Sequence, residues 1–149
     1  MDISKFTARF GEDQQKALQG IDVPIGEGFV IKVARSNNDR ASAAYRELMS
    51  APDIELWRRA GLLDRPNDEV VKRLREINIE IYSKHILIGW TGLTENGVDV
   101  PYSPAKAREL LAIPDFNDLV RRVAETSENY RRDAVEGAAE TLGKPSNGN

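Results

Sequence analysis

The sequence contains no cysteine and a single histidine, His85. Without cysteine the chain cannot form disulfides, thiolate zinc sites or iron–sulfur clusters, and it has no cysteine nucleophile. One histidine excludes metal sites that are built from several imidazoles. It also leaves any scheme of the serine–histidine–aspartate type dependent on His85 alone.

Long apolar runs and an excess of positive charge are lacking as well. Apolar runs such as Ile-Leu-Ile at 86–88 do not exceed four residues, far short of the roughly 20 residues that a membrane-spanning helix needs. The 21 Lys and Arg residues are outnumbered by 24 Asp and Glu residues, whereas nucleic-acid-binding proteins usually carry a clear basic excess. The first residues also lack the basic and apolar segments of a secretory signal. We therefore expect a cytoplasmic protein that binds neither membrane nor nucleic acid.

Motifs for enzymatic chemistry are sparse. The Gly-Glu-Gly sequence at 26–28 precedes a predicted strand, whereas a dinucleotide-binding loop follows a strand and opens a helix. No Gly-Lys-Ser or Gly-Lys-Thr sequence is present. His85 has no carboxylate four residues away to orient it, because those positions are Ile81 and Gly89. The sequence predicts no enzymatic activity and no metal, nucleotide or other cofactor.

Helical periodicity dominates the pattern, with one clear strand candidate. Residues 28–35 combine β-branched and aromatic side chains between turn residues and predict a strand. A lone strand needs a partner, and residues 21–25, another segment of the chain or a second copy are the alternatives. Helices are predicted over 39–49, 54–61, 68–88, 104–112 and 114–130. The predicted fold is mainly α with a small β element (α+β), and it includes a long C-terminal helix.

The chain divides into one compact helical domain and two peripheral segments. Residues 1–26 have few apolar anchors and predict a flexible N-terminal arm. Residues 27–130 form the predicted helical core domain, and residues 131–149 a helical extension with a disordered polar tail. The apolar end of the long helix at 86–90 places Trp90 in the core. An exposed Trp90 would instead be typical of an interface anchor.

A longer pattern of short motifs crosses these elements between residues 28 and 135. After the strand and the long helix come a Trp-Thr-Gly-Leu sequence at 90–93, a Glu-Asn-Gly turn at 95–97, a Pro-Tyr-Ser helix start at 101–103 and an Asn-Tyr-Arg sequence at 129–131. This order resembles the small tail assembly chaperones of long-tailed (siphovirus-like) bacteriophages.

The resemblance implies a non-catalytic role in the host cytoplasm during assembly of a phage tail. Such chaperones bind the long helical tape-measure protein, keep it soluble and help recruit tail-tube subunits, and they are generally absent from the finished virion. Many also exist as a longer frameshifted form, which implies the tail-tube protein as a second partner. A helical domain with a groove can cover the apolar stripe of such a helix, and self-association would multiply the sites along it.

Candidate partner-binding residues lie at the C-terminal end and around the two tryptophans. The apolar stripe of the last helix continues past residue 130, and small residues there allow close helix approach. We expect the partner to contact Tyr130, Ala134, Val135, Ala138 and Leu142, with grooves around Trp57 and Trp90 as the other candidates. A structural virion component or a head–tail adaptor that forms an oligomer is the alternative function. A small regulatory or enzyme-accessory protein is a third.

Overall fold

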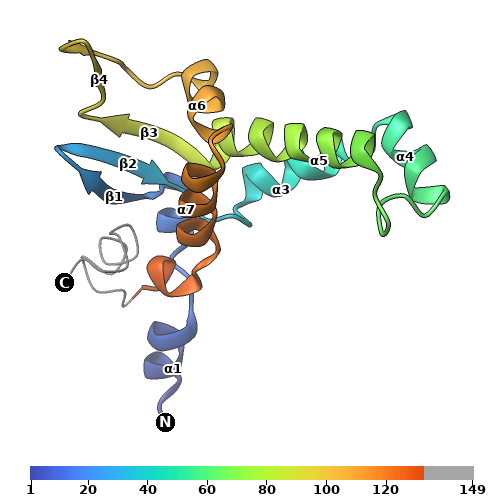
Figure 1. Ribbon diagram of the computed structural model, residues 1–149. Helices are drawn as coiled ribbons and strands as arrows, with labels where there is room; N and C mark the ends of the chain where they lie inside the picture. The colour runs from blue at the N-terminus through green and yellow to red at the C-terminus, as the bar shows by residue number, and fades with distance from the viewer. Residues whose placement is uncertain (133–149) are drawn as a thin grey trace.

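The computed structural model describes residues 1–132 of the chain. Its α-helices are α1 (Ile3–Phe10), α2 (Gln14–Gln19), α3 (Asp39–Leu48), α4 (Pro52–Arg59), α5 (Asp68–Ile81), α6 (Pro104–Leu111) and α7 (Pro114–Glu125). In Figure 1 a small sheet lies to the left, α7 runs down the middle, and α3, α4 and α5 extend to the right. We call α3, α4 and α5 the arm, and the sheet with α2, α6 and α7 the body. The predicted α+β fold class is confirmed.

Three helices, α3, α5 and α6, begin at capping side chains. The side chains of Asn38 and Asn67 accept hydrogen bonds from the backbone N–H groups of Ala41 (3.0 Å) and Val70 (2.9 Å). The hydroxyl of Ser103 does the same for Lys106 at the start of α6. Each cap satisfies an N–H group that the helix itself leaves unpaired. Cap chemistry therefore fixes where the arm and α6 begin.

The sheet has three antiparallel strands in the order β1 (Ile21–Gly26), β2 (Phe29–Val33) and β3 (Leu87–Thr91). The strand predicted at 28–35 is confirmed as β2, but it is not the one main strand, because β1 and β3 are of similar length. Of the alternatives for the partner of β2, pairing with residues 21–25 is confirmed, and β3 provides the second. A second copy of the chain is not needed to complete this sheet.

The long helix predicted over 68–88 ends earlier than expected. The α-helix α5 stops at Ile81, a π-helical segment follows over Tyr82–Ile86, and β3 begins at Leu87. The register of β3 places Leu87 opposite Val33 and Trp90 opposite Ile31. The apolar run at 86–90 fits a buried strand as well as a helix end, and pairing with β2 decides between them.

A two-strand hairpin, β4 (Thr94–Glu95) with β5 (Val98–Asp99), follows β3. Its turn residues Asn96 and Gly97 both have positive φ angles, 51° and 80°, as a tight hairpin turn requires. The predicted turn is confirmed. The paired strands start at Thr94, and the N–H of Val100 donates to the carbonyl of Leu93 (2.8 Å).

The core lies between the inner face of the sheet and α7. Val23, Ile31 and Val33 from the sheet and Val120 and Val123 from α7 are fully buried. The helix predicted to reach residue 130 ends at Glu125, and a short 3-10 helix over Ser127–Tyr130 follows. The chain turns there so that the buried Tyr130 hydroxyl donates to the carbonyl oxygen of Val33 (2.9 Å).

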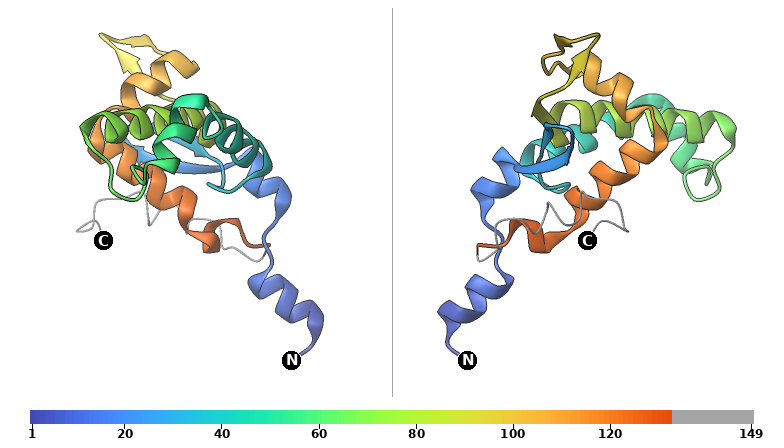
Figure 2. Two further views of the ribbon diagram at one scale, coloured as in Figure 1. Left: turned by 90° about the vertical axis from the view of Figure 1, so that its right-hand side faces the viewer. Right: turned by 60° about the vertical axis from the view of Figure 1, so that its left-hand side comes forward.

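The N-terminal residues are more regular than the predicted arm at 1–26. Ala17 of α2 and Val23 of β1 belong to the buried residues, and the boundary predicted at residue 26 falls inside the β1–β2 hairpin. Glu12 is tied to Arg35 by an ion pair of 2.8 Å. Among residues 1–26, only α1 stands away from the body, as both views in Figure 2 show.

Candidate partner-binding groove

His85 lies on the π-helical segment between α5 and β3. It lines a small hollow of about 240 Å³ together with Glu80 and Lys84. Burial lowers the pKa of the His85 imidazole, and the positive charges of Lys84 and Arg40 lower it further, while Glu80 acts in the opposite direction. The Glu80 carboxylate is itself paired with Lys84 (2.5 Å) and Arg108 (3.7 Å). His85 is therefore surrounded mainly by cations that oppose its protonation, and the carboxylate nearest to it is already engaged.

Residues 1–132 lack two features that would indicate other classes of site. That part of the chain contains no group of three or more His, Cys, Asp or Glu side chains that could hold a metal ion. None of its helices is long and apolar enough to cross a membrane.

Two hollows lie along α5, one on each side of the helix. On one side, α3 and the end of α7 enclose a hollow of about 570 Å³ whose floor is Ile77 and Ile81, with Tyr45 at its edge. We call it the Tyr45 hollow. On the other side, the α6–α7 corner encloses a hollow of about 440 Å³ that includes Val71 and Ile79, the Val71 hollow.

The two hollows share two lining residues, Leu74 and Asn78 of α5. We therefore treat them as one surface, the α5 groove. Its apolar side chains are only partly covered: Tyr45 is 53% exposed and Val71 is 40% exposed. Aromatic and aliphatic side chains that remain exposed around a hollow are typical of surfaces that bind other proteins.

Side-chain amides hold the floor of the groove in place. The amide nitrogen of Asn117 on α7 donates to the side-chain oxygen of Asn78 (3.3 Å) and to the carbonyl of Leu111 (3.0 Å). The guanidinium of Arg121 donates to the side-chain oxygen of Asn117 (3.2 Å). This chain of hydrogen bonds ties α5 to α7 between the two hollows, so the groove is preorganised.

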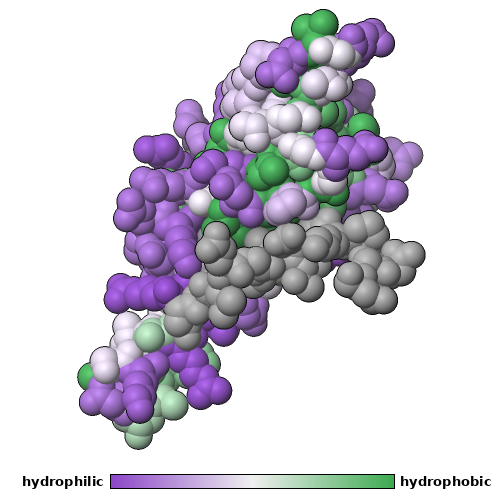
Figure 3. All heavy atoms as spheres, turned by 90° about the vertical axis from the view of Figure 1, so that its left-hand side faces the viewer, coloured by the Kyte–Doolittle hydropathy of each residue, from purple (hydrophilic) through white to green (hydrophobic). Residues whose placement is uncertain are grey.

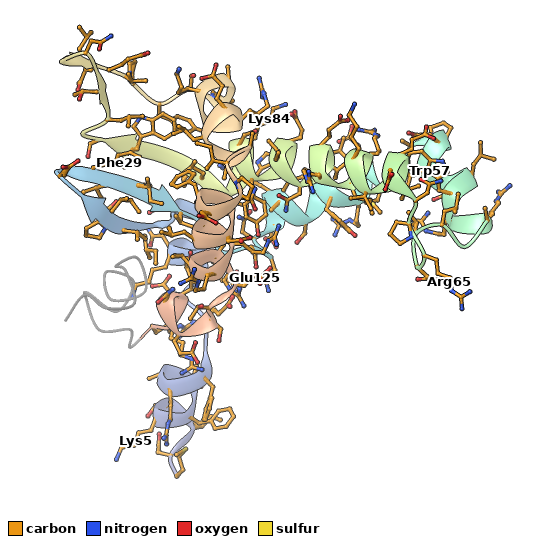
Figure 4. All side chains as sticks on the ribbon, viewed as in Figure 1. Lys5, Phe29, Trp57, Arg65, Lys84 and Glu125 are labelled. Atoms are coloured by element: carbon orange, nitrogen blue, oxygen red, sulfur yellow. The ribbon has the colours of Figure 1, made fainter. Side chains whose placement is uncertain are left out.

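Charged residues of both signs line the groove. Arg46 and Glu125 lie in the Tyr45 hollow, and Arg75, Asp118 and Arg121 in the Val71 hollow. Figure 4 shows Glu125 at the lower end of α7, near the junction with the arm. An apolar floor between opposite charges suits a helix that carries an apolar stripe with polar flanks.

The structure separates the site residues that the sequence predicted. Trp90 is buried, its indole N–H donates to the carbonyl of Val100 (2.8 Å), and its ring meets Phe29 and Tyr102 edge-on. Its predicted place in the core is confirmed, on a strand instead of a helix end. Tyr130 is also fully buried, so its side chain does not reach the surface at which a partner would bind.

The remaining predicted residues lie elsewhere. Trp57 is half-buried at the far end of the arm (Figure 4), in a hollow with charged walls that include Asp53 and Arg73. Ala134, Val135, Ala138 and Leu142 lie outside the described residues. The sequence did not single out Tyr45 and Val71 as surface residues, because both have the helical spacing that core residues also show.

The fold and the groove together define an α+β domain with a largely apolar groove along α5. The family model described as YdaY prophage protein matches residues 37–144, which is most of the 149 residues, and the chain belongs to this family. The protein is therefore phage-derived. No curated protein and no solved structure matches the chain.

Proposed function

We propose that this prophage protein is a tail assembly chaperone that binds a helical segment of the phage tape-measure protein in the host cytoplasm and keeps it soluble. The observation that carries the proposal is the α5 groove, with an apolar floor and partly exposed Tyr45 and Val71 at its edge. Recruitment of tail-tube subunits and absence from the mature virion belong to the same proposal. They follow from the resemblance to the chaperone family.

The groove suits a helical partner for a physical reason. An amphipathic helix presents apolar side chains three and four residues apart, and such a stripe docks into a groove between helices. Tyr45 would contact the partner as a large, rigid side chain of the kind that dominates interface energies. The opposite charges of Arg46 and Glu125 would favour one orientation of the partner.

A tape-measure protein is long, so a chaperone must cover it at many points. Each site then needs only modest affinity, because copies bound side by side act together. The size of the α5 groove agrees with this, since hollows of about 570 and 440 Å³ accommodate a few side chains instead of a whole domain.

Co-expression with the tape-measure protein tests the proposal. Val71→Asp places a charge in the groove, and Val98→Asp makes the same change on β5, where Val98 is 69% exposed. We expect the parent and Val98→Asp to keep the tape-measure protein in the soluble fraction and Val71→Asp to lose much of it. Equal solubility with all three proteins would contradict the proposed groove.

Analysis of purified particles separates this proposal from the alternative of a virion component or head–tail adaptor. A chaperone is absent from purified phage particles. A fixed number of copies in each particle would favour the structural role.

A further inference from the structure

The N-terminal helix α1 exposes an apolar side on a projection from the body (Figure 2; Figure 3, lower left). Ile3, Phe6 and Phe10 are 75%, 49% and 54% exposed, and α1 buries none of its residues. Their spacing of three and four residues sets them on one side of the helix, and the rings of Phe6 and Phe10 lie 5.0 Å apart. A helix of eight residues is marginal in water unless such a side packs against another surface. The helix α1 therefore has the form of an amphipathic helix that binds in a groove.

The Tyr45 hollow of the arm is a groove for a helix of this kind. Its floor, Ile77 and Ile81, lies between α3 and the end of α7, and its volume of about 570 Å³ admits a few side chains. Tyr45 at its edge is 53% exposed. The described chain thus carries both halves of a helix-in-groove contact, and each half leaves apolar side chains exposed.

Charge favours the Tyr45 hollow over the Val71 hollow as the place for α1. The helix contains two bases and no acid, and the guanidinium of Arg9 borders the apolar side, 5.7 Å from the centre of the Phe10 ring. The Val71 hollow has two arginines and one aspartate, whereas the Tyr45 hollow has one arginine and one glutamate, Glu125. Glu125 is exposed and forms no ion pair within residues 1–132. A base on α1 therefore finds a carboxylate to pair with at the Tyr45 hollow.

Contacts at the base of α1 hold it away from the groove of its own chain. The carbonyl of Gly11 accepts from the N–H of Arg132 (3.2 Å), and Glu12 forms its 2.8 Å ion pair with Arg35. These contacts fix the residues that directly follow α1 to the body. In Figure 1, α1 points downward and the arm extends to the right, and Figure 2 shows the same separation. The hollow that α1 can enter therefore belongs to a second copy of the chain.

We propose that α1 of one copy docks in the Tyr45 hollow of a second copy. Phe6 and Phe10 pack on the apolar floor of the hollow, and Arg9 pairs with Glu125. Each copy offers one helix and one hollow, so the contact is head-to-tail and can repeat from copy to copy. An eight-residue helix buries less than the roughly 800 Å² per partner of a standard interface. The association is therefore weak and reversible.

The consequence of this contact for tail assembly rests on the proposed function. The tape-measure helix and α1 of a second copy would occupy the same floor, so they compete for it. In this arrangement α1 covers the groove until the tape-measure helix displaces it. The chaperone thereby keeps its own apolar groove covered in the absence of its partner.

Sedimentation velocity of the full-length chain alone, over micromolar to millimolar concentrations, tests the contact. Phe6→Asp alters only the helix and Tyr45→Asp only the hollow, and both residues are about half exposed. Leu56→Asp on α4, where Leu56 is 65% exposed, is the control. We expect the parent and Leu56→Asp to associate as the concentration rises. The other two variants should associate at least roughly thirtyfold more weakly, the effect of losing an aromatic ring that dominates an interface.

A mixture of Phe6→Asp and Tyr45→Asp tests the head-to-tail arrangement. The first variant keeps an intact hollow and the second an intact α1, so the mixture should form dimers and no larger species. Such dimers also show that both variants are folded. A parent that stays monomeric throughout, a mixture that stays monomeric while the parent associates, or association lost only in Leu56→Asp would each overturn the proposal.

The ion pair is tested by reversing both of its charges. Arg9→Glu should weaken association, and Arg9→Glu with Glu125→Arg in one chain should restore it. Failure of the double variant to associate would overturn this placement of α1. These measurements contain no tape-measure protein, so their failure is distinguishable from failure of the co-expression test of the proposed function.

Discussion

Aromatic side chains have opposite surroundings in two regions of the molecule. Trp90 and Tyr130 lie in the body, whereas Tyr45 and Phe6 lie on the projecting helices. Trp90 and Tyr130 are buried, and their polar ends pair with the carbonyl groups of Val100 and Val33. Tyr45 at the α5 groove and Phe6 on α1 are about half exposed. Similar ring sizes therefore serve different purposes in the two regions.

The difference indicates which aromatic residues hold the fold together and which are available to a partner. A buried ring with a satisfied polar group contributes to folding through packing and through its hydrogen bond. An exposed ring at the edge of a hollow contributes little until something covers it. Substitutions in the body should therefore change stability, and substitutions at the groove or on α1 should change binding instead.

Trp90→Ala gives the largest expected effect. Loss of the buried indole ring should lower the free energy of unfolding by about 3–5 kcal/mol, the usual range for a large aromatic side chain in a core. Urea denaturation of the parent and the variant measures this difference. Trp57→Ala is the matched control, and its smaller cost reflects a half-buried ring. A similar loss of unfolding free energy in the two variants would contradict the proposed difference between body and arm.

Tyr130→Phe removes a single hydroxyl from the body. The carbonyl of Val33 would lose this donor in a buried setting, so the free energy of unfolding should fall by about 1–3 kcal/mol. Tyr45→Phe removes the same hydroxyl from a half-exposed ring and should change stability by less than about 0.5 kcal/mol. If the two variants unfold at the same urea concentration, the distinction between the two tyrosines is wrong.

Removal of residues 1–10 tests the independence of α1 from the core. Because α1 buries no residue, the free energy of unfolding of the body should change by less than about 1 kcal/mol. Removal of residues 1–20 also deletes the buried Ala17 and the Glu12–Arg35 ion pair, and it should cost clearly more. A large loss from the shorter deletion would show that α1 supports the body.

His85 should give the smallest effect, through the pH dependence of stability. Its pKa is lowered in the folded protein by burial and by Lys84 and Arg40, so the unfolded chain binds this proton more tightly. The contribution is present above the unfolded pKa of about 6.5 and is lost as the pH falls through that value toward the lower folded pKa. Unfolding free energies of the parent and His85→Gln, compared across this window, should diverge in slope. Parallel curves would exclude the effect.

Local signals in the sequence predicted much of the fold. Asn38, Asn67 and Ser103 mark helix starts through side chains that bond to nearby N–H groups, and Asn96-Gly97 marks a turn through its backbone preference. These effects depend on residues within three or four positions of each other. They were therefore visible without any knowledge of the tertiary structure.

Non-local contacts account for what the sequence reasoning missed. The change from helix to strand near residue 86 depends on pairing with Val33, more than fifty positions earlier. The turn after Glu125 brings the Tyr130 hydroxyl within hydrogen-bond distance of the Val33 carbonyl. No glycine or proline in the sequence marks this turn. The helical spacing of apolar residues continues both through residue 86 and past Glu125, so this spacing alone does not reveal either change of structure.

The candidate groove was hidden for a related reason. Tyr45 and Val71 have the spacing of core residues on α3 and α5, but the arm projects from the body and leaves these positions open (Figure 1). A stripe of apolar residues shows which face of a helix is apolar, and not whether the chain covers that face. The angle between the arm and α7 decides this.

Hydrogen–deuterium exchange with a helical segment of the tape-measure protein tests the central claim most directly. The account predicts slower exchange on binding in residues 41–48 of α3, and in residues 71–82 of α5 and the segment after it, which line the α5 groove. The β4–β5 hairpin at 94–99 serves as an internal control and should stay unchanged. Protection confined to the hairpin or to the far end of the arm around Trp57, or no protection at saturating partner, would contradict the account.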